Sequence, residues 1–470
     1  MAELRRLASA VIQLGFAGDD PPGWLQRALA DGLGGALLWN RDGAAETVAA
    51  LRSENPGVLV AMSEAGGSQD WPANGALGVL DPATTGKVAS AIGHDLAAAG
   101  IAMKYAPVAD VNSNPFNPII GTRSFGSSPG PVASHVVAYV EGIQATGVAA
   151  CVKHFPGHGD TSLDSHLGLP TVGTDAGELF DGPLRPFRAA AEAGARAMMT
   201  AHIRLPAIDD LPATLSRTLL TDILRGELGY DGLVVTDALE MAALERAYGL
   251  EESAVAAIAA GADALFLGGW QDPAAGLTRV RDALIAAVSA GRLPEERLAE
   301  AAGRVSGLSA WCDRARSTDG HATATGIGRT AAHDAIRVTG TITPLRTAPH
   351  VIELAPPWGV RGLRTPWGLL AAMTRRWAGT TGERVDREGL QPAAIPADRP
   401  LVIVVRDAYR HPWVGAVLTA TLQARPDATV VEMGLPVGQA PRCAAYLTTS
   451  SATAVSSEAV ADLLTEPRRP

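Results

Sequence analysis

The chain has 470 residues, of which 47% are hydrophobic and 19% are charged, and its formal net charge is −10 at pH 7. A single hydrophobic core stops growing at about 250–300 residues, so this length predicts two domains. The acidic balance argues against a nucleic acid or an anionic membrane surface as partner, because both require a basic face, and it favours a small or neutral ligand.

The cysteines and the apolar segments indicate the compartment. Three widely spaced cysteines, Cys151, Cys312 and Cys443, are typical of a reducing compartment rather than a disulfide framework. The first apolar run is short, contains Gln13 and is not followed by an A-x-A cleavage site. No apolar stretch approaches the roughly 20 residues that span a bilayer. We therefore expect a cytoplasmic protein without a membrane partner, and the sequence carries no signal for its oligomeric state.

Short apolar runs alternate with Ala-rich segments of helical periodicity through the first two thirds of the chain. The eight runs cover residues 10–16, 34–39, 58–63, 103–108, 148–155, 197–203, 232–237 and 262–269. Alternation of buried strands with helices is typical of a parallel βα architecture. Eight such units match a (β/α)8 barrel of the TIM type better than an open sheet, for which about five or six strands are usual.

A smaller second domain is expected after the barrel. Two helical stretches, 276–290 and 294–311, precede a segment of small residues without apolar periodicity, which predicts a linker. We expect the barrel with its trailing helices over 1–316, the linker over 317–328 and an α/β layered sandwich over 329–470. The expected elements of the sandwich are strands at 350–357, 400–407, 429–436 and 444–450, and helices at 413–424 and 457–466.

Polar residues lie at the ends of several of the eight runs. They are Glu64 after the third run, Asp110 after the fourth, Lys153 and His154 in the fifth, His202 in the sixth and Asp237 at the end of the seventh. Barrel active sites are built at the carboxyl ends of the strands, so these side chains are expected to converge. The alternative is that polar residues follow strands because loops are polar.

The stretch "KHFPGHGDTSLDSH" concentrates ionisable residues at 153–166. Its three histidines, His154, His158 and His166, with Asp160 or Asp164, could bind zinc in principle. The stretch has no HExxH or CxxC spacing, and its glycines and proline indicate a loop rather than one face of a helix. No metal site is therefore predicted.

Asp164 and His166 are two residues apart, and in an extended segment such residues point to the same side. A carboxylate that holds one imidazole nitrogen fixes the tautomer of the histidine and stabilises its protonated form. That arrangement makes imidazole a proton donor and acceptor near neutral pH. The pattern alone leaves open whether His166 is such a group or an ordinary loop histidine.

Residues 153–170, "KHFPGHGDTSLDSHLGLP", closely resemble the signature of glycoside hydrolase family 3. The resemblance is strongest to its β-N-acetylglucosaminidase branch, in which the Asp-Ser-His loop carries the general acid/base. Residues 106–129 are similar to the sugar-pocket segment of that family and 231–241 to its nucleophile segment. Residues 404–413 are similar to two-domain members.

The resemblance implies a role for each matching residue. Asp237 would be the nucleophile that forms a glycosyl-enzyme, and His166, oriented by Asp164, would protonate the leaving oxygen and then deprotonate water. Two inversions at the anomeric carbon give net retention. Arg123, Lys153 and His154 would hydrogen-bond the sugar. Further candidates for substrate contacts are Glu64, Asp110 and His202, of which the last two have an equally good structural reading, whereas His158 is expected to be structural.

The third expected strand departs from the family pattern. Family members read D-x-E-G-G with an arginine a few residues later, whereas this chain has Ser63 and Trp71 at these places. Loss of a charge-assisted hydrogen bond forfeits about 1.5–3 kcal/mol. The chain then accepts a sugar altered at position 4 or 6, or Glu64 and Asp70 have taken over the contacts, or its activity has decayed.

The resemblance and the residues together predict a retaining exo-glycosidase for terminal β-linked N-acetylhexosamine, without metal or cofactor, whose partner is a small carbohydrate. The resemblance implies muropeptides or related aminosugar glycosides as substrates. One alternative is a phosphorylase, because a neutral imidazole does not repel an incoming phosphate as a carboxylate would. Another is a non-catalytic sugar-binding protein that kept the barrel.

Overall fold

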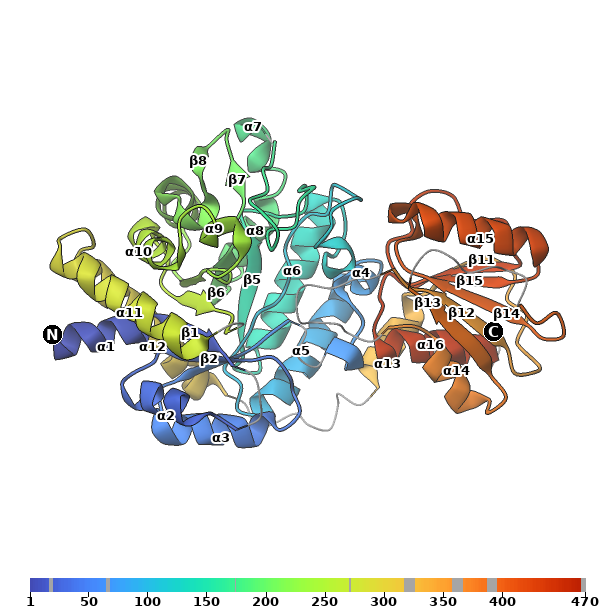
Figure 1. The fold of residues 1–470 in the computed structure, drawn as a ribbon, viewed down its shortest axis with the longest axis horizontal. Helices are drawn as coiled ribbons and strands as arrows, with labels where there is room; N and C mark the ends of the chain where they lie inside the picture. Colours follow the sequence, from blue (N-terminus) through green and yellow to red (C-terminus); the bar gives the residue numbers. More distant parts are fainter. Residues whose placement is uncertain are drawn as a thin grey trace. The chain divides into compact units, whose positions relative to one another are not determined.

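The computed structural model describes most of the chain in two compact units (Figure 1). The described residues are 1–16, 20–64, 68–173, 175–269, 272–316, 326–356, 367–386 and 395–465. The first unit comprises Met1–Gly66, Thr85–Ile120 and Ser127–Ala324, and the second comprises Gly67–Thr84, Gly121–Gly126 and Thr325–Pro470. Most of the expected linker, residues 317–325, lies outside the described part of the chain.

The first unit is a nearly closed parallel barrel. Its eight strands are β1 (Ile12–Gly15), β2 (Gly35–Leu38), β3 (Leu59–Met62), β4 (Met103–Lys104), β5 (Ala149–Phe155), β6 (Ala197–Thr200), β9 (Leu233–Val235) and β10 (Leu265–Leu267). Their order is β10-β1-β2-β3-β4-β5-β6-β9, and a parallel bridge between Val235 and Ala264 joins the two ends. Each predicted apolar run contains one of these strands, so the barrel prediction is confirmed.

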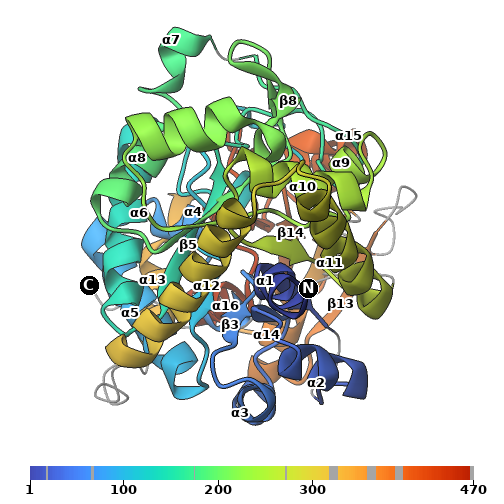
Figure 2. The same ribbon diagram turned by 90° about the vertical axis from the view of Figure 1, so that its left-hand side faces the viewer.

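Helices surround the strands of the barrel (Figure 2). They are α1 (Ala2–Ala10), α2 (Gly23–Ala30), α3 (Ala44–Glu54), α5 (Pro82–Ala98), α6 (Pro129–Gln144), α8 (Arg185–Glu192), the π-helix η4 (Thr218–Glu227), α10 (Leu250–Ala260), α11 (Pro273–Ser289) and α12 (Glu295–Ala315). The loops carry η3 (Ala213–Leu215), α7 (Ala176–Leu179), α9 (Ala242–Glu245) and an antiparallel pair, β7 (Arg204–Leu205) and β8 (Asp209–Pro212). Buried side chains of the strands fill the barrel, so it is a packed core.

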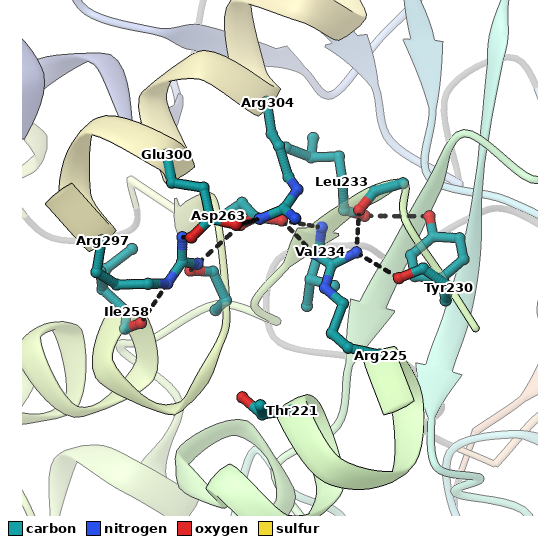
Figure 3. Close-up of polar contacts among 12 residues, drawn as sticks. Thr221, Arg225, Tyr230, Leu233, Val234, Ile258, Asp263, Arg297, Glu300 and Arg304 are labelled. Carbon is teal, nitrogen blue, oxygen red and sulfur yellow. Dashed lines mark hydrogen bonds and ion pairs between the residues drawn. The ribbon is translucent and has the colours of Figure 1, made fainter. Parts of the chain in front are cut away.

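A buried carboxylate joins helices to the amino end of the barrel (Figure 3). Asp263 lies just before β10, is fully buried and accepts hydrogen bonds from three arginines and from the backbone N–H of Val234. The guanidinium distances are 2.6 Å to Arg225 of η4, and 2.7 and 3.2 Å to Arg297 and Arg304 of α12. One side chain therefore connects two helices to the end of the barrel opposite the predicted site.

The second unit is a three-layer α/β sandwich, as expected from the sequence. Its sheet has the order β11-β16-β15-β14-β12-β13, and only β11 runs antiparallel to its neighbour. The strands are β11 (Arg337–Gly340), β12 (His350–Leu354), β13 (Thr381–Val385), β14 (Leu401–Val405), β15 (Thr429–Glu432) and β16 (Ala445–Thr448). Among the described residues, α13 (Ile327–Asp334), α14 (Leu370–Arg376) and α16 (Ala454–Thr465) cover one face, and α15 (Pro412–Ala424) covers the other.

Two short segments that interrupt the barrel sequence belong to the second unit. The segment 68–84 carries η1 (Ser68–Asp70) and α4 (Asn74–Leu77), and the other carries η2 (Gly121–Arg123). The Ala73 N–H donates to Ser451 Oγ at 3.0 Å, and the Ala454 N–H donates to Gln69 Oε1 at 3.0 Å. These bonds connect the segment after β3 to the region of α16, and Asn74 Nδ2 connects the segment after β4 by donating to the Arg123 carbonyl at 2.8 Å.

Among the described residues, no helix combines the length and the apolar character that crossing a membrane requires.

Candidate active site

The predicted site residues of the first unit lie at one end of the barrel. Glu64 follows β3, Asp110 follows β4, Lys153 and His154 end β5, His202 follows β6 and Asp237 follows β9. The Asp164–His166 segment lies in the loop after β5. Since the strands are parallel, their carboxyl ends meet on one face, which is where barrel enzymes build their sites.

Asp110 is fully buried and holds the loop that follows β5. Its Oδ2 lies 2.7 Å from His154 Nδ1, and its Oδ1 accepts the His158 N–H at 2.6 Å and the His154 N–H at 3.2 Å. Burial tends to raise the pKa of the Asp110 carboxyl, but its attraction to His154 and these hydrogen bonds outweigh burial and lower it. Asp110 therefore orients the His154 imidazole through Nδ1.

Two lysines organise the carboxyl end of β3. Lys153 Nζ lies 2.9 Å from Glu64 Oε2. Lys104, which the sequence analysis did not single out, donates from Nζ to the carbonyl of Ser63 at 3.2 Å and to that of Glu64 at 3.4 Å. Burial lowers the pKa of Lys104 to about 8, against the opposing attraction of Glu64. The two lysines thus hold the Glu64 carboxylate and the carbonyls of Ser63 and Glu64 in place at the end of β3.

The two departures from the family pattern have structural partners. Ser63 is only 5% exposed, and its Oγ donates to the carbonyl of Trp39 at 3.2 Å. Trp71 lies in the second unit, where a Cβ added to Gly328 would stand 2.9 Å from the indole ring. Helix α13 therefore approaches Trp71 closely at a glycine. Neither side chain replaces the charged group that the family pattern has at its position.

Asp164 and His166 form a hydrogen-bonded pair. His166 Nδ1 lies 2.8 Å from Asp164 Oδ1, which also accepts the His166 N–H at 2.9 Å. The expectation of an extended segment is wrong, because the Asp164 carbonyl accepts the N–H groups of Leu167 and Gly168 in a turn. Aspartate side chains favour such turns by bonding to nearby backbone N–H groups. Burial tends to raise the pKa of Asp164, but its bonds to His166 outweigh burial and lower it.

His158 is buried beneath this turn. Its Nδ1 lies 2.7 Å from Thr161 Oγ1, and its Nε2 lies 3.1 Å from Ser165 Oγ. Burial lowers the pKa of His158 to about 4, so the imidazole is neutral at neutral pH. This histidine belongs to the support of the turn.

Asp237 lies just past β9, and its Oδ1 accepts the Ala238 N–H at 2.8 Å. Burial tends to raise the pKa of the Asp237 carboxyl, but attraction to nearby histidines outweighs burial and lowers that pKa. The histidines that act on it are His154, His202 and His166. The Asp237 carboxylate and the Asp164–His166 pair therefore lie at the same end of the barrel, past the carboxyl ends of β9 and β5.

His202 supports the segment that carries Asp237. Its Nε2 lies 2.9 Å from the carbonyl of Ala238, and its Nδ1 lies 2.8 Å from Thr214 Oγ1. Burial is the main cause of a lowered pKa, so the imidazole is neutral and can donate to that carbonyl through Nε2. These contacts favour the structural reading of His202 over direct substrate binding.

Glu240 was missed by the sequence analysis, although it lies three residues after Asp237. Its carboxylate accepts the N–H groups of Gly268 at 2.8 Å and Gly269 at 3.2 Å, just past β10. A carboxylate within the otherwise apolar stretch "ALEMAAL" was the available signal. Glu240 thereby ties the segment after β9 to the carboxyl end of β10.

Arg123 lies in η2 of the second unit, where its carbonyl accepts a hydrogen bond from Asn74 Nδ2 at 2.8 Å. Within the described part of the chain, no group of three or more His, Cys, Asp or Glu side chains is arranged to hold a metal ion.

Comparison with known proteins identifies the relatives of this architecture. The family model described as "Glycosyl hydrolase family 3 N terminal domain" matches residues 55–308. A beta-hexosaminidase of Alkalilimnicola ehrlichii is 37% identical over 262 residues, which are 50% of this chain and 73% of that protein. Beta-hexosaminidase A of Pseudoalteromonas piscicida is 44% identical over 190 residues, and this match covers 38% of the chain but only 32% of the relative.

A solved structure resembles nearly the whole chain. The family 3 beta-N-acetylglucosaminidase of Paenibacillus sp. str. FPU-7 superposes with a TM-score of 0.87 at 30% identity, covering 98% of this chain and 96% of that one. The likeness extends over both units.

Proposed function

Because the chain belongs to glycosyl hydrolase family 3, we propose that it is a retaining exo-glycosidase that hydrolyses terminal β-linked N-acetylhexosamine. The observation that carries the proposal is the placement of Asp237 just past β9 at the end of the barrel where the loop after β5 carries the hydrogen-bonded Asp164–His166 pair, since this combines a carboxylate with a carboxylate-oriented imidazole. The aminosugar is supported by the names of relatives, which are beta-hexosaminidases and a beta-N-acetylglucosaminidase.

In the first step, an oxygen of Asp237 attacks the anomeric carbon and the glycosidic C–O bond breaks. His166, protonated and held by Asp164, gives its proton to the departing oxygen. In the second step, neutral His166 takes a proton from water as the water attacks the same carbon, and Asp237 leaves. Each step inverts the anomeric carbon, so the product retains its configuration.

We assign the sugar contacts of the first unit to Lys153 and His154. The Asp110 carboxylate orients His154, and the ion pair with Glu64 directs Lys153, so both donors are presented at the carboxyl end of β5. Arg123, in the second unit, stays a candidate for a sugar contact on the resemblance of its segment to the family's sugar-pocket segment. We propose muropeptides as the substrate class and the cytoplasm as the location of the protein.

The decisive experiment uses 4-nitrophenyl β-N-acetylglucosaminide with and without inorganic phosphate. We expect phenol release that phosphate does not accelerate, and a loss to about one thousandth of the rate in Asp237→Asn, whose amide cannot form a glycosyl-enzyme. A slow fluorinated substrate should leave its mass on the peptide that contains Asp237. A label elsewhere would remove Asp237 as the nucleophile.

Other outcomes point to the alternatives. Turnover that requires phosphate and yields a sugar phosphate would establish a phosphorylase. A folded wild-type chain that binds the sugar without releasing phenol from any aryl β-glycoside would be a non-catalytic sugar-binding protein.

A further inference from the structure

The turn that carries the Asp164–His166 pair is held at its middle residue. Ser165 is only 2% exposed, whereas the side chains of Asp164 and His166 keep 18% and 16% of their surface exposed. The hydroxyl of Ser165 lies 3.1 Å from His158 Nε2. The middle residue is thus anchored inside the protein.

The His158 side of this bond is itself fixed by two further hydrogen bonds and by burial of the ring. Its backbone N–H donates to Asp110 Oδ1 at 2.6 Å, its Nδ1 lies 2.7 Å from Thr161 Oγ1, and the ring is buried. A neutral imidazole has one donor and one acceptor nitrogen, and both partners are hydroxyls that can take either role. The Thr161 hydroxyl donates to the His158 carbonyl at 3.1 Å, so it accepts from Nδ1–H, and Nε2 accepts the Ser165 hydroxyl without a charge on the ring.

Ser165 also contacts the segment that follows Asp237. Its carbonyl accepts the N–H of Ala243 at 3.2 Å, and Ala243 belongs to α9, which begins five residues after Asp237. The same residue therefore connects the turn of the Asp164–His166 pair to the segment of the carboxylate. A displacement of Ser165 would change the distance between His166 and Asp237.

We infer that His158 and Ser165 are a positioning pair for proton transfer, whose hydrogen bond sets where the His166 imidazole stands relative to Asp237. Neither residue touches the reacting atoms. This inference rests on the proposed function, because it assigns the proton donor to His166. It also gives a mechanistic role to the one histidine of the 153–166 stretch that the reaction itself does not use.

The test is Ser165→Ala, which removes one buried hydroxyl and retains the backbone bond to Ala243. Methyl or alkyl β-N-acetylglucosaminides need a proton on the departing oxygen, whereas aryl glycosides with acidic phenols do not. We expect kcat/KM to fall roughly 10- to 100-fold on the alkyl substrates, because a misplacement of about 1 Å costs about that much, and less than about threefold on the aryl substrates. Azide should restore part of any lost turnover on the aryl substrates.

The matched control is Ser162→Ala in the same loop. Its hydroxyl accepts from Asn114 Nδ2 at 3.2 Å and, within the described part of the chain, makes no hydrogen bond with the His158 ring, so both substrate classes should stay within about twofold of wild type. His166→Ala supplies the reference pattern, with a larger selective loss on alkyl substrates. Thermal unfolding of each variant verifies that the barrel is folded.

The outcomes separate the two claims. If His166→Ala is selective for alkyl substrates and folded Ser165→Ala is not, the positioning pair is overturned and the proposed function stands. If His166→Ala slows both classes equally, the acid/base assignment is overturned and the inference falls with it. Selective loss in Ser162→Ala equal to that in Ser165→Ala would also refute the pair, because any loop change would then suffice.

Discussion

Replacing Asp263 with asparagine is expected to destabilise the barrel without touching the catalytic face. The substitution keeps the shape of the side chain but removes the negative charge that three arginines share at the amino end of β10. The asparagine amide can also present an N–H group to a guanidinium, which is a repulsive contact. The buried cluster would then contain three cations with one remaining carboxylate, that of Glu300, which pairs with Arg297 and Arg304.

The magnitude follows from burial and from the contacts that remain. Asp263 is fully buried, and breaking a buried ion pair by removing one partner costs about 3–5 kcal/mol. The lower part of that range applies here, because Arg225 keeps the carbonyls of Tyr230 and Gly232 as acceptors. Natural domains are stable by about 5–15 kcal/mol, so the loss is a large fraction of the total.

Thermal unfolding followed by circular dichroism measures this effect. For a large domain, about 1 kcal/mol corresponds to about 2–4 °C, so the barrel transition should fall by roughly 6–16 °C. The matched control is Asp282→Asn, which breaks a pair with Arg281 whose carboxylate side is 58% exposed and should cost about 0–1 kcal/mol. A shift in Asp263→Asn no larger than in the control would refute the account of the cluster.

Two predictions concern the catalytic face. Restoring the family's aspartate by Ser63→Asp should not improve sugar binding, because the new carboxylate would face the Trp39 carbonyl that now accepts the serine hydroxyl. A tenfold gain in kcat/KM with unchanged stability would contradict this expectation. The pKa of Asp237 lies below the ordinary aspartate pKa of about 3.9. The Asp237 nucleophile therefore becomes protonated only when the pH falls below that ordinary value. The acid limb of kcat/KM on an aryl substrate should therefore lie below about pH 4, and a limb near pH 6 in folded enzyme would show that the histidines do not stabilise the carboxylate.

The barrel could be predicted from the sequence because its strands are buried on both sides and read as continuous apolar runs. The second sheet was predicted only in its centre. Strand β11 is exposed at all four residues, and β13 has the polar sequence "TGERV", so neither edge strand has an apolar run to detect. Edge strands are commonly polar, since they must not pair with other chains.

The sequence predicted where the catalytic candidates lie, because they stand at the ends of apolar runs. It did not predict their hydrogen-bond partners. The bond between His158 and Ser165 depends on a turn that brings two side chains seven residues apart together. The membership of 68–84 and 121–126 in the second unit depends on packing between distant segments. A Cβ on Gly78 would stand 1.8 Å from the carbonyl oxygen of Phe125, so the two segments pack in direct contact there. The residue pattern of neither segment predicts this contact.

This shared membership has a consequence for how the chain folds. Residues 68–84 are synthesised long before Ser451 and Ala454, to which they bond, so the second unit cannot be completed until these later residues have been synthesised. Loop-closure entropy must be lost before such distant contacts form, which slows folding. During synthesis, residues 68–84 therefore lack these hydrogen-bond partners while the neighbouring barrel strands are made. Helix α16 carries Ala454, whose N–H bonds to Gln69, so the second unit is expected to form by pairing of distant segments rather than from one continuous stretch of chain.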